Sequence, residues 1–216
     1  QYQKEAALDE ELYRRRLRAL GPDHPDTFGA MQNLAYTYYR LGRYAEAEEL
    51  QRRGLEIGRR ILGNEHPNVL LALGNLANTL VSEHKLQEAE ALQREALELR
   101  RRVLGPDHPE TQFAIGNLAL VLLAQKRYGQ AEQLYREALQ GEIKALGENH
   151  PEIAYAWYNL ATAEAAQKKR ANALSDLDRA IDHGYTDTEE IASDEGWEPL
   201  RNDAGYQQAI ARMKHQ

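Results

Sequence analysis

Apolar residues recur along most of this chain at the three- and four-residue spacing of an amphipathic helix, and charged residues fill the positions between them. In residues 1–20, for example, Leu8, Leu12, Leu17 and Leu20 lie at roughly helical spacing, and arginines supply a charged face. The pattern predicts an all-helical chain.

One short motif interrupts the helical pattern four times, at intervals of 42 residues. In this motif a Leu-Gly pair is followed three residues later by His-Pro, so a glycine suited to a helix end precedes a proline suited to a helix start. Each unit therefore divides into two antiparallel helices, which in the first unit run over residues 25–41 and 44–62. The four copies are Leu20, Gly21, His24, Pro25; Leu62, Gly63, His66, Pro67; Leu104, Gly105, His108, Pro109; and Leu146, Gly147, His150, Pro151.

A fixed period of this length is typical of a solenoid, in which each unit buries its apolar face against its neighbours. We expect residues 1–20 to be the second helix of a truncated repeat, covered by a preceding helix in a longer array. Since the chain opens on Gln1 within a helical pattern, we expect it to be a piece of a longer protein. Repeats are expected at residues 21–62, 63–104, 105–146 and 147–183, followed by a capping segment at 184–216.

Several positions keep their residue type in every unit. The triplet Asn-Leu-Ala begins at Asn33, Asn75, Asn117 and Asn159, and a small residue recurs in the second helix at Ala47, Ala89, Ala131 and Ala173. This pattern resembles the tetratricopeptide repeat, whose usual period is 34 residues, here in the 42-residue form of kinesin light chains and their bacterial relatives. The departures are Gln51 and Gln93 at a usual aromatic position, Gly54 for alanine, and Glu164 at a core position.

The resemblance implies a right-handed superhelical α-solenoid of antiparallel helix pairs, with a concave groove that receives extended peptides. The segment after Ala180 is similar to the C-terminal end of arrays attached to bacterial serine/threonine kinases of the eukaryotic type. It contains Tyr185, Ile191, Trp197, Leu200, Tyr206 and Ile210, which we expect to cover the last repeat.

In the resembled fold the groove is lined by the first helix of each repeat. A second stripe on these helices, next to the core stripe, is therefore the candidate peptide-binding surface. It comprises Asn33, Tyr36, Tyr39, Arg40, Leu71, Gly74, Asn75, Asn78, Phe113, Gly116, Asn117, Leu120, Tyr155, Tyr158 and Asn159. Because Arg40 is the only base of the stripe, we expect a protein or linear peptide with a largely apolar motif as the partner.

Two features of the stripe need an explanation beyond helix formation. Gly74 and Gly116 stand inside helices, where glycine costs about 1 kcal/mol relative to alanine, so close approach of another backbone is one reason for them. The repeated asparagine can donate to and accept from a bound peptide backbone. Alternatively, each asparagine bonds the neighbouring repeat and sets its register, and both readings can hold.

Composition narrows the remaining classes of function. The 216 residues include no cysteine, which excludes disulfides and thiolate chemistry, and no apolar run long enough to span a membrane is present. The net charge of −7 is concentrated in residues 182–198, which argues against nucleic acid or an anionic membrane as the partner. We expect a cytoplasmic protein.

No arrangement of residues indicates catalysis, a cofactor or a metal site. The four histidines of the repeated motif, His24, His66, His108 and His150, would lie roughly 20 Å apart, one per helix pair. Zinc needs all its ligands at about 2 Å. We therefore expect a non-enzymatic interaction module or scaffold. The alternatives are a regulatory, substrate-recruiting or self-associating segment of a larger enzyme such as a kinase, and nucleic-acid binding through arginine-rich second helices such as that of Arg100, Arg101 and Arg102.

Overall fold

The computed structural model describes residues 2–214, and within this range all regular structure is helical. The predicted segment bounds at residue 1 and residue 216 lie outside the described residues. The chain divides into two compact units, Gln1–Val103 and Leu104–Gln216, and each is considered by itself. Both are built of consecutive packed helix pairs, which confirms the predicted all-helical solenoid.

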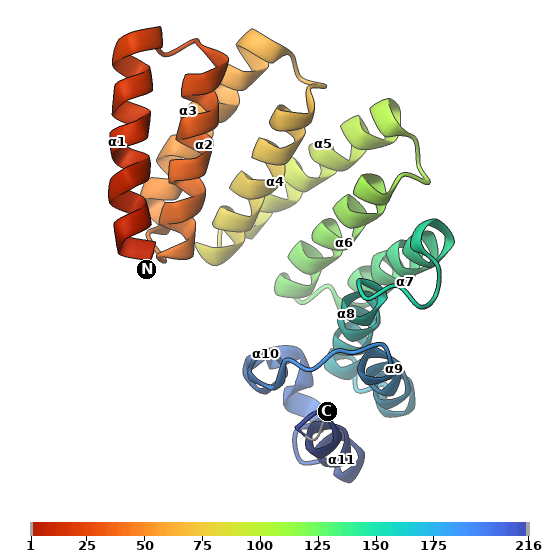
Figure 1. The fold of residues 1–216 in the computed structure, drawn as a ribbon. Helices are drawn as coiled ribbons and strands as arrows, with labels where there is room; N and C mark the ends of the chain where they lie inside the picture. The colour runs from red at the N-terminus through yellow and green to blue at the C-terminus, as the bar shows by residue number, and fades with distance from the viewer. Residues whose placement is uncertain (1, 215–216) are drawn as a thin grey trace. The chain divides into compact units, whose positions relative to one another are not determined.

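The first unit contains five helices joined by short turns. Helix α2 packs against both α1 and α3, and α3 packs against α4 (Figure 1). The helices are α1 (Tyr2–Leu20), α2 (Pro25–Arg40), α3 (Tyr44–Leu62), α4 (Pro67–Ser82) and α5 (Leu86–Leu104).

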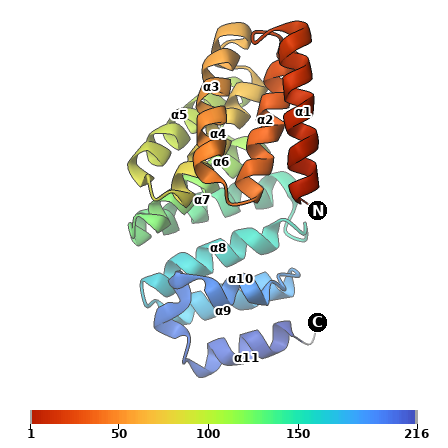
Figure 2. The ribbon, with the colours of Figure 1, turned by 90° about the vertical axis from the view of Figure 1, so that its left-hand side faces the viewer.

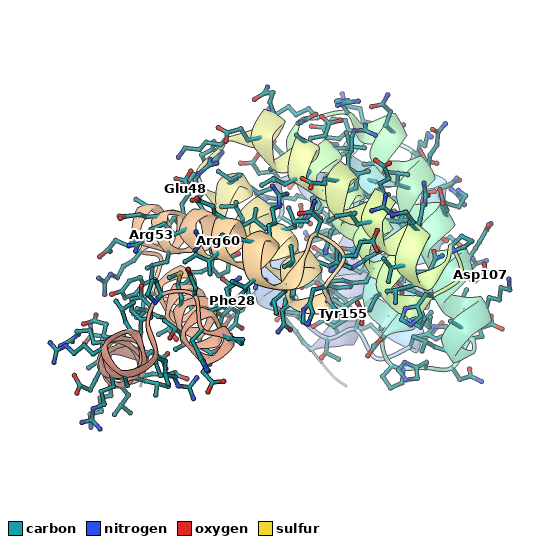
Figure 3. The ribbon with its side chains drawn as sticks, turned by 90° about the horizontal axis from the view of Figure 1, so that it is seen from above. Phe28, Glu48, Arg53, Arg60, Asp107 and Tyr155 are labelled. Carbon is teal, nitrogen blue, oxygen red and sulfur yellow. The ribbon has the colours of Figure 1, made fainter. Side chains whose placement is uncertain are left out.

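Close helix packing in this unit depends on a small residue. Phe28 of α2, labelled in Figure 3, is only 2% exposed. A Cβ atom added at Gly58 of α3 would lie 3.0 Å from the ring of Phe28. Glycine therefore lets α3 approach α2 at this point, as interdigitated helix packing requires.

The second unit continues the helix pairs and ends in a different arrangement. Helix α7 packs against α6 and α8, α8 packs against α9, and α11 lies against α9 (Figure 2). The elements are α6 (Pro109–Ala124), α7 (Tyr128–Leu146), α8 (Ile153–Ala166), α9 (Arg170–Asp182), α10 (Thr188–Ser193), the 3-10 helix η1 (Glu195–Leu200) and α11 (Ala204–Met213).

The histidine of the repeated motif caps the start of the first helix in the first three repeats, and His150 makes the same bond in the turn before α8. In the third repeat, His108 Nδ1 accepts a hydrogen bond from the backbone N–H of Glu110 at 3.2 Å, and α6 begins at Pro109. The same bond forms at His24, His66 and His150. The histidine thus satisfies one of the free N–H groups at the helix N-terminus, which is a structural role.

The turn between the two helices of a repeat uses a left-handed residue. Gly42 has φ 73°, and the matching residues His84, Lys126 and Lys168 have φ of 58°, 61° and 61°. Non-glycine residues are uncommon in this region of backbone space, so three of the four turns hold a side chain against its conformational preference.

Glu164 occupies a core position, and its buried carboxylate forms an ion pair. Its side chain is 0% exposed, and Arg136 Nη2 lies 2.9 Å from Glu164 Oε1. Burial raises the pKa of Glu164, the nearby Asp176 raises it further, and the charge of Arg136 lowers it. Pairing with Arg136 therefore allows the fourth repeat to keep its packing although an acid replaces an apolar residue.

The segment after α9 covers α8. Trp197 is fully buried, and its indole N–H donates to Thr162 Oγ1 at 2.9 Å. Five of the six apolar residues predicted to cover the last repeat are buried, and Ile210 is half-buried. This segment gives α8 the neighbour that a further repeat would otherwise supply.

Candidate peptide-binding site

A pocket of about 430 Å³ opens on the second unit, between α6, α7 and α8. Its size is within the range of small-molecule and side-chain binding sites. Its wall is formed by Pro109, Phe113, Gly116, Asn117, Leu120, Tyr135, Glu142, Leu146, Glu152, Tyr155, Ala156, Asn159 and Glu190. It is therefore a feature of one unit alone.

Six of the predicted peptide-binding residues meet in this pocket. Three of them are large apolar or aromatic side chains that remain exposed: Phe113 at 64%, Leu120 at 43% and Tyr155 at 53%. Tyr155 is labelled in Figure 3. The other three are Gly116, Asn117 and Asn159. Exposed apolar side chains gathered on one concave surface are typical of an interaction site.

The two asparagines of the pocket have free amide groups. No residue that the structure describes forms a hydrogen bond with the side chain of Asn117 or Asn159, and both side chains are partly exposed. Asn33 and Asn75 in the first unit also lack such a bond to any described residue. The alternative in which each asparagine bonds the neighbouring repeat thus has no support from these contacts.

Gly116 leaves open space in the pocket wall. A Cβ atom added there would meet no heavy atom within 4 Å, and the same is true of Gly74 in the first unit. No part of the protein itself therefore requires a glycine at either position. The space is available to an external group that approaches the helix backbone.

Three carboxylates also border the pocket, on α7, on the turn before α8 and on α10. They belong to Glu142, Glu152 and Glu190, and no lysine, arginine or histidine forms part of the wall. Burial raises the pKa of Glu142 to about 7, and the charge of Glu152 contributes. Burial also raises the pKa of Glu190, although the hydroxyl of Tyr185 donates to it at 3.0 Å and opposes this effect. The pocket is thus both apolar and acidic.

Tyr135 of α7 borders the pocket with a buried polar group. The residue is 3% exposed, and its hydroxyl has no hydrogen-bond partner among the described residues. Burial raises the pKa of this phenol, as does the charge of Asp194. A buried hydroxyl without a partner is unusual in a folded protein and calls for an explanation.

Tyr158, which we expected in the groove, does not face the pocket. It is 2% exposed, its hydroxyl donates to Asp194 Oδ2 at 2.7 Å, and its ring stacks on that of Tyr185 at a centroid distance of 4.2 Å. The physical reason is that the C-terminal segment lies against this part of α8. The protein's own side chains occupy the surface expected to be free.

The other predicted residues lie on α2 and α4 of the first unit. On α2, Tyr36 is half exposed, and its hydroxyl accepts a hydrogen bond from Arg40 Nη1 at 2.9 Å. Tyr39 is partly buried and lies 5.5 Å from the ring of Tyr44. On α4, Leu71 is 58% exposed.

The amide of Asn78 on α4 is engaged within the first unit. Gln93 Nε2 donates to Asn78 Oδ1 at 3.5 Å. The predicted residues of the first unit thus include free side chains, hydrogen-bonded side chains and one ring that lies against another at a tilt.

The acids and Tyr135 of the pocket wall were not predicted from the sequence, although two signals for them were present. Tyr135 stands at the repeat position where Gln51 and Gln93 replace the usual aromatic residue. Glu142 stands 42 residues after Arg100, so the charge at this position changes sign between neighbouring repeats. Glu190 lies outside the repeats, and no internal comparison could identify it.

Residues 2–214 contain no group of three or more His, Cys, Asp or Glu side chains placed to hold a metal ion. Within the same range, every helix is too short or too polar to cross a lipid bilayer.

Solved structures with a similar fold are numerous, whereas no curated protein matches the chain. A variant of a putative kinesin light chain of Podosopora anserina with nearly identical TPR-like repeats is 25% identical. The match has a TM-score of 0.75 and covers 85% of this chain and 86% of that chain. BtubC (BKLC) of P. vanneervenii is also 25% identical, with a TM-score of 0.71 and coverage of 85% and 75%.

A more distant match shows the fold alone. The apo form of RapI is 18% identical, with a TM-score of 0.73, and the match covers 93% of this chain and 73% of that chain.

The family model for the tetratricopeptide repeat matches residues 5–59, 28–101, 69–141 and 110–183. These overlapping matches run through both units and end where the non-repeating C-terminal segment begins. The chain therefore belongs to the tetratricopeptide repeat family.

Proposed function

We propose that this chain is a protein-interaction module that binds an extended segment of a partner through the first helices of its repeats. Repeat arrays of this family generally bind proteins, and stacked helix pairs provide extended concave surfaces. The observation that carries the proposal is the pocket of the second unit, where free amides stand beside exposed apolar side chains.

The chemistry of the wall suits a peptide in extended conformation. The amides of Asn117 and Asn159 can each donate to a peptide carbonyl and accept from a peptide N–H. Phe113, Leu120 and Tyr155 can bury the alternate side chains of that peptide. Backbone hydrogen bonds and apolar contacts would together supply affinity without a demand for one sequence.

A role within a larger enzyme uses the same surface. If the chain is the C-terminal region of a bacterial serine/threonine kinase, the pocket would recruit a substrate or a second copy of the kinase. The resemblance of residues 184–216 to such arrays favours this origin. Whether the chain acts alone or within a kinase, a partner peptide should bind to the isolated chain.

The test is to select binders from a displayed random peptide library and to measure the best of them by calorimetry. Asn117→Ala and Leu120→Glu should each weaken binding about tenfold or more, which is about 1.4 kcal/mol. Leu8→Glu, which changes an exposed leucine of α1 in the other unit, is the matched control and should bind like the parent. Equal binding by all three variants would remove the pocket as the site.

A further inference from the structure

The pocket wall carries three carboxylates and no positively charged side chain. Glu142, Glu152 and Glu190 form no ion pair with any lysine or arginine that the structure describes. Glu142 is half-buried, whereas Glu152 and Glu190 are exposed at the rim. The charge of Glu152 raises the pKa of Glu142, so these two like charges destabilise one another. A positively charged group from outside would relieve this repulsion.

A second observation at the same place is independent of the charges. The hydroxyl of Tyr135 is buried beside the pocket and has no hydrogen-bond partner among the described residues. A phenolic oxygen can accept a hydrogen bond from an ammonium or guanidinium group, both of which only donate. The unsatisfied hydroxyl and the unpaired carboxylates therefore lack the same kind of partner.

The apolar part of the wall limits what that partner can be. A small inorganic cation would leave Phe113, Leu120 and Tyr155 exposed, and the carboxylates are not arranged as metal ligands among the residues described. A lysine or arginine side chain combines a charged head with an apolar stem that packs along aromatic surface. An aromatic ring such as that of Tyr155 also attracts a cation near its face.

We propose that the segment bound in this pocket carries a lysine or arginine next to an apolar residue, with the cationic head held among Glu142, Glu152, Glu190 and Tyr135. The inference rests on the proposed function and replaces the largely apolar motif expected from the sequence with a basic and apolar one. The apolar neighbour packs on Phe113 and Leu120, and the amides of Asn117 and Asn159 hold the backbone.

The probe is the displayed random peptide library, scored for residue type in the peptides that the parent protein enriches. We expect enrichment of Lys and Arg over Asp and Glu, beside an apolar residue. The selected peptides should bind Glu142→Gln and Glu152→Gln about tenfold more weakly. Glu148→Gln lies in the nearby turn outside the pocket wall, makes the same change of net charge, and should not change affinity.

Tyr135→Phe provides a second readout that does not depend on charge. It removes one oxygen atom that has no partner among the described residues of the free protein, so thermal stability should stay the same or rise while affinity falls about threefold or more.

The results separate this inference from the proposed function. Enriched peptides that are neutral or acidic, and that depend on Asn117 and Leu120, would overturn the basic partner and retain the groove. Equal affinity of the parent, Glu142→Gln and Glu152→Gln for basic peptides would overturn the carboxylate site as well. If no peptide is enriched, or if binding is insensitive to Asn117→Ala and Leu120→Glu, the proposed function fails.

Discussion

The hydroxyl of Tyr158 donates a hydrogen bond to Asp194 at 2.7 Å and thereby joins the first helix of the fourth repeat to the C-terminal segment. Asp194 also accepts from Thr162 Oγ1 at 3.3 Å and from the backbone N–H of Gly196 at 2.8 Å. One carboxylate thus holds α8, the turn after α10 and the start of η1 together. The segment that ends the repeats is fixed by polar contacts as well as by buried aromatic rings.

Asp194→Ala should lower the free energy of unfolding by about 2–3 kcal/mol, because it removes two side-chain hydrogen bonds and the cap of η1. It also leaves the buried hydroxyl of Tyr158 without its acceptor. Urea unfolding followed by circular dichroism measures the change. Asp187→Ala, which removes only the surface cap of α10, is the control and should cost about 1 kcal/mol. Equal losses in the two variants would show that Asp194 does no more than cap η1.

Gly116→Ala should stabilise the protein and weaken ligand binding. The added methyl group meets no atom of the protein within 4 Å, so the gain in helix propensity of about 1 kcal/mol is not offset by a clash. The same methyl group would occupy space that a bound backbone needs. Gly29→Ala on α2, where the space is also open, is the control for stability. Increased stability with unchanged peptide affinity would show that no ligand approaches Gly116.

Lys168→Gly should stabilise the turn between α8 and α9 by about 0.5–1 kcal/mol. Lys168 has φ 61°, which glycine adopts without the steric cost that a Cβ atom imposes, although glycine also loses more entropy on folding. Gly42→Ala makes the reverse change at the matching turn of the first repeat and should destabilise. Thermal unfolding of both variants gives the test. Stabilisation in both, or loss in both, would contradict this explanation.

His108→Ala should cost about 1 kcal/mol of stability, because it removes the acceptor for the N–H of Glu110 at the start of α6. His108→Asn keeps a side-chain acceptor at the same position and should lose much less. Chemical denaturation of the two variants, compared with the parent, separates capping from simple packing. An equal loss in both would show that the imidazole ring acts through its contacts and not through Nδ1.

The repeats could be read from the sequence because each helix boundary is set by local chemistry. Proline, glycine and a capping side chain act within a few residues, so the starts of α2, α4 and α6 at Pro25, Pro67 and Pro109 were predicted correctly. In the fourth repeat α8 begins at Ile153, two residues after Pro151. The solenoid of helix pairs followed from the 42-residue period, and the tetratricopeptide type followed from the resemblance of the repeated residues to that family.

The candidate site was less accessible to this reasoning because it depends on contacts between distant residues. The burial of Tyr158 requires Tyr185 and Asp194, which lie in a segment without a repeat to compare. The acidic wall requires Glu142 of α7 and Glu190 of α10 to border the same pocket. Stripes on a single helix show which residues face outward, but not what the neighbouring helices place beside them.

The acidic wall predicts opposite pH dependences for ligand binding and for stability. Burial and the charge of Glu152 raise the pKa of Glu142 to about 7, above its ordinary value of 4.5. The other titratable groups of the wall are Glu190, Tyr135 and Tyr155, and α6 contributes none. The carboxyl of Glu142 is therefore mostly protonated at pH 6 and mostly ionised at pH 8.

A basic peptide pairs with the ionised form of Glu142, so its affinity should rise about tenfold from pH 6 to pH 8. A tenfold change in affinity corresponds to the same free energy as a shift of one pKa unit. The free protein should show the reverse trend. A carboxyl whose pKa is raised by folding binds its proton more tightly in the folded state, so its stabilising contribution is lost as pH rises from about 4.5 to 7.

Calorimetry from pH 6 to 8 measures how peptide affinity depends on pH. Urea unfolding from about pH 4.5 to 7 measures how the stability of the same protein depends on pH. Glu142→Gln carries no titrating group at this position. It should flatten the trend in affinity and reduce the trend in stability, to which Glu164 also contributes because burial raises its pKa, whereas Glu148→Gln should keep both trends. Because Glu142 moves affinity and stability in opposite directions, a general effect of pH on the fold cannot reproduce both changes. Affinity that falls as pH rises, or a slope that Glu142→Gln leaves unchanged, would assign the titration to another group.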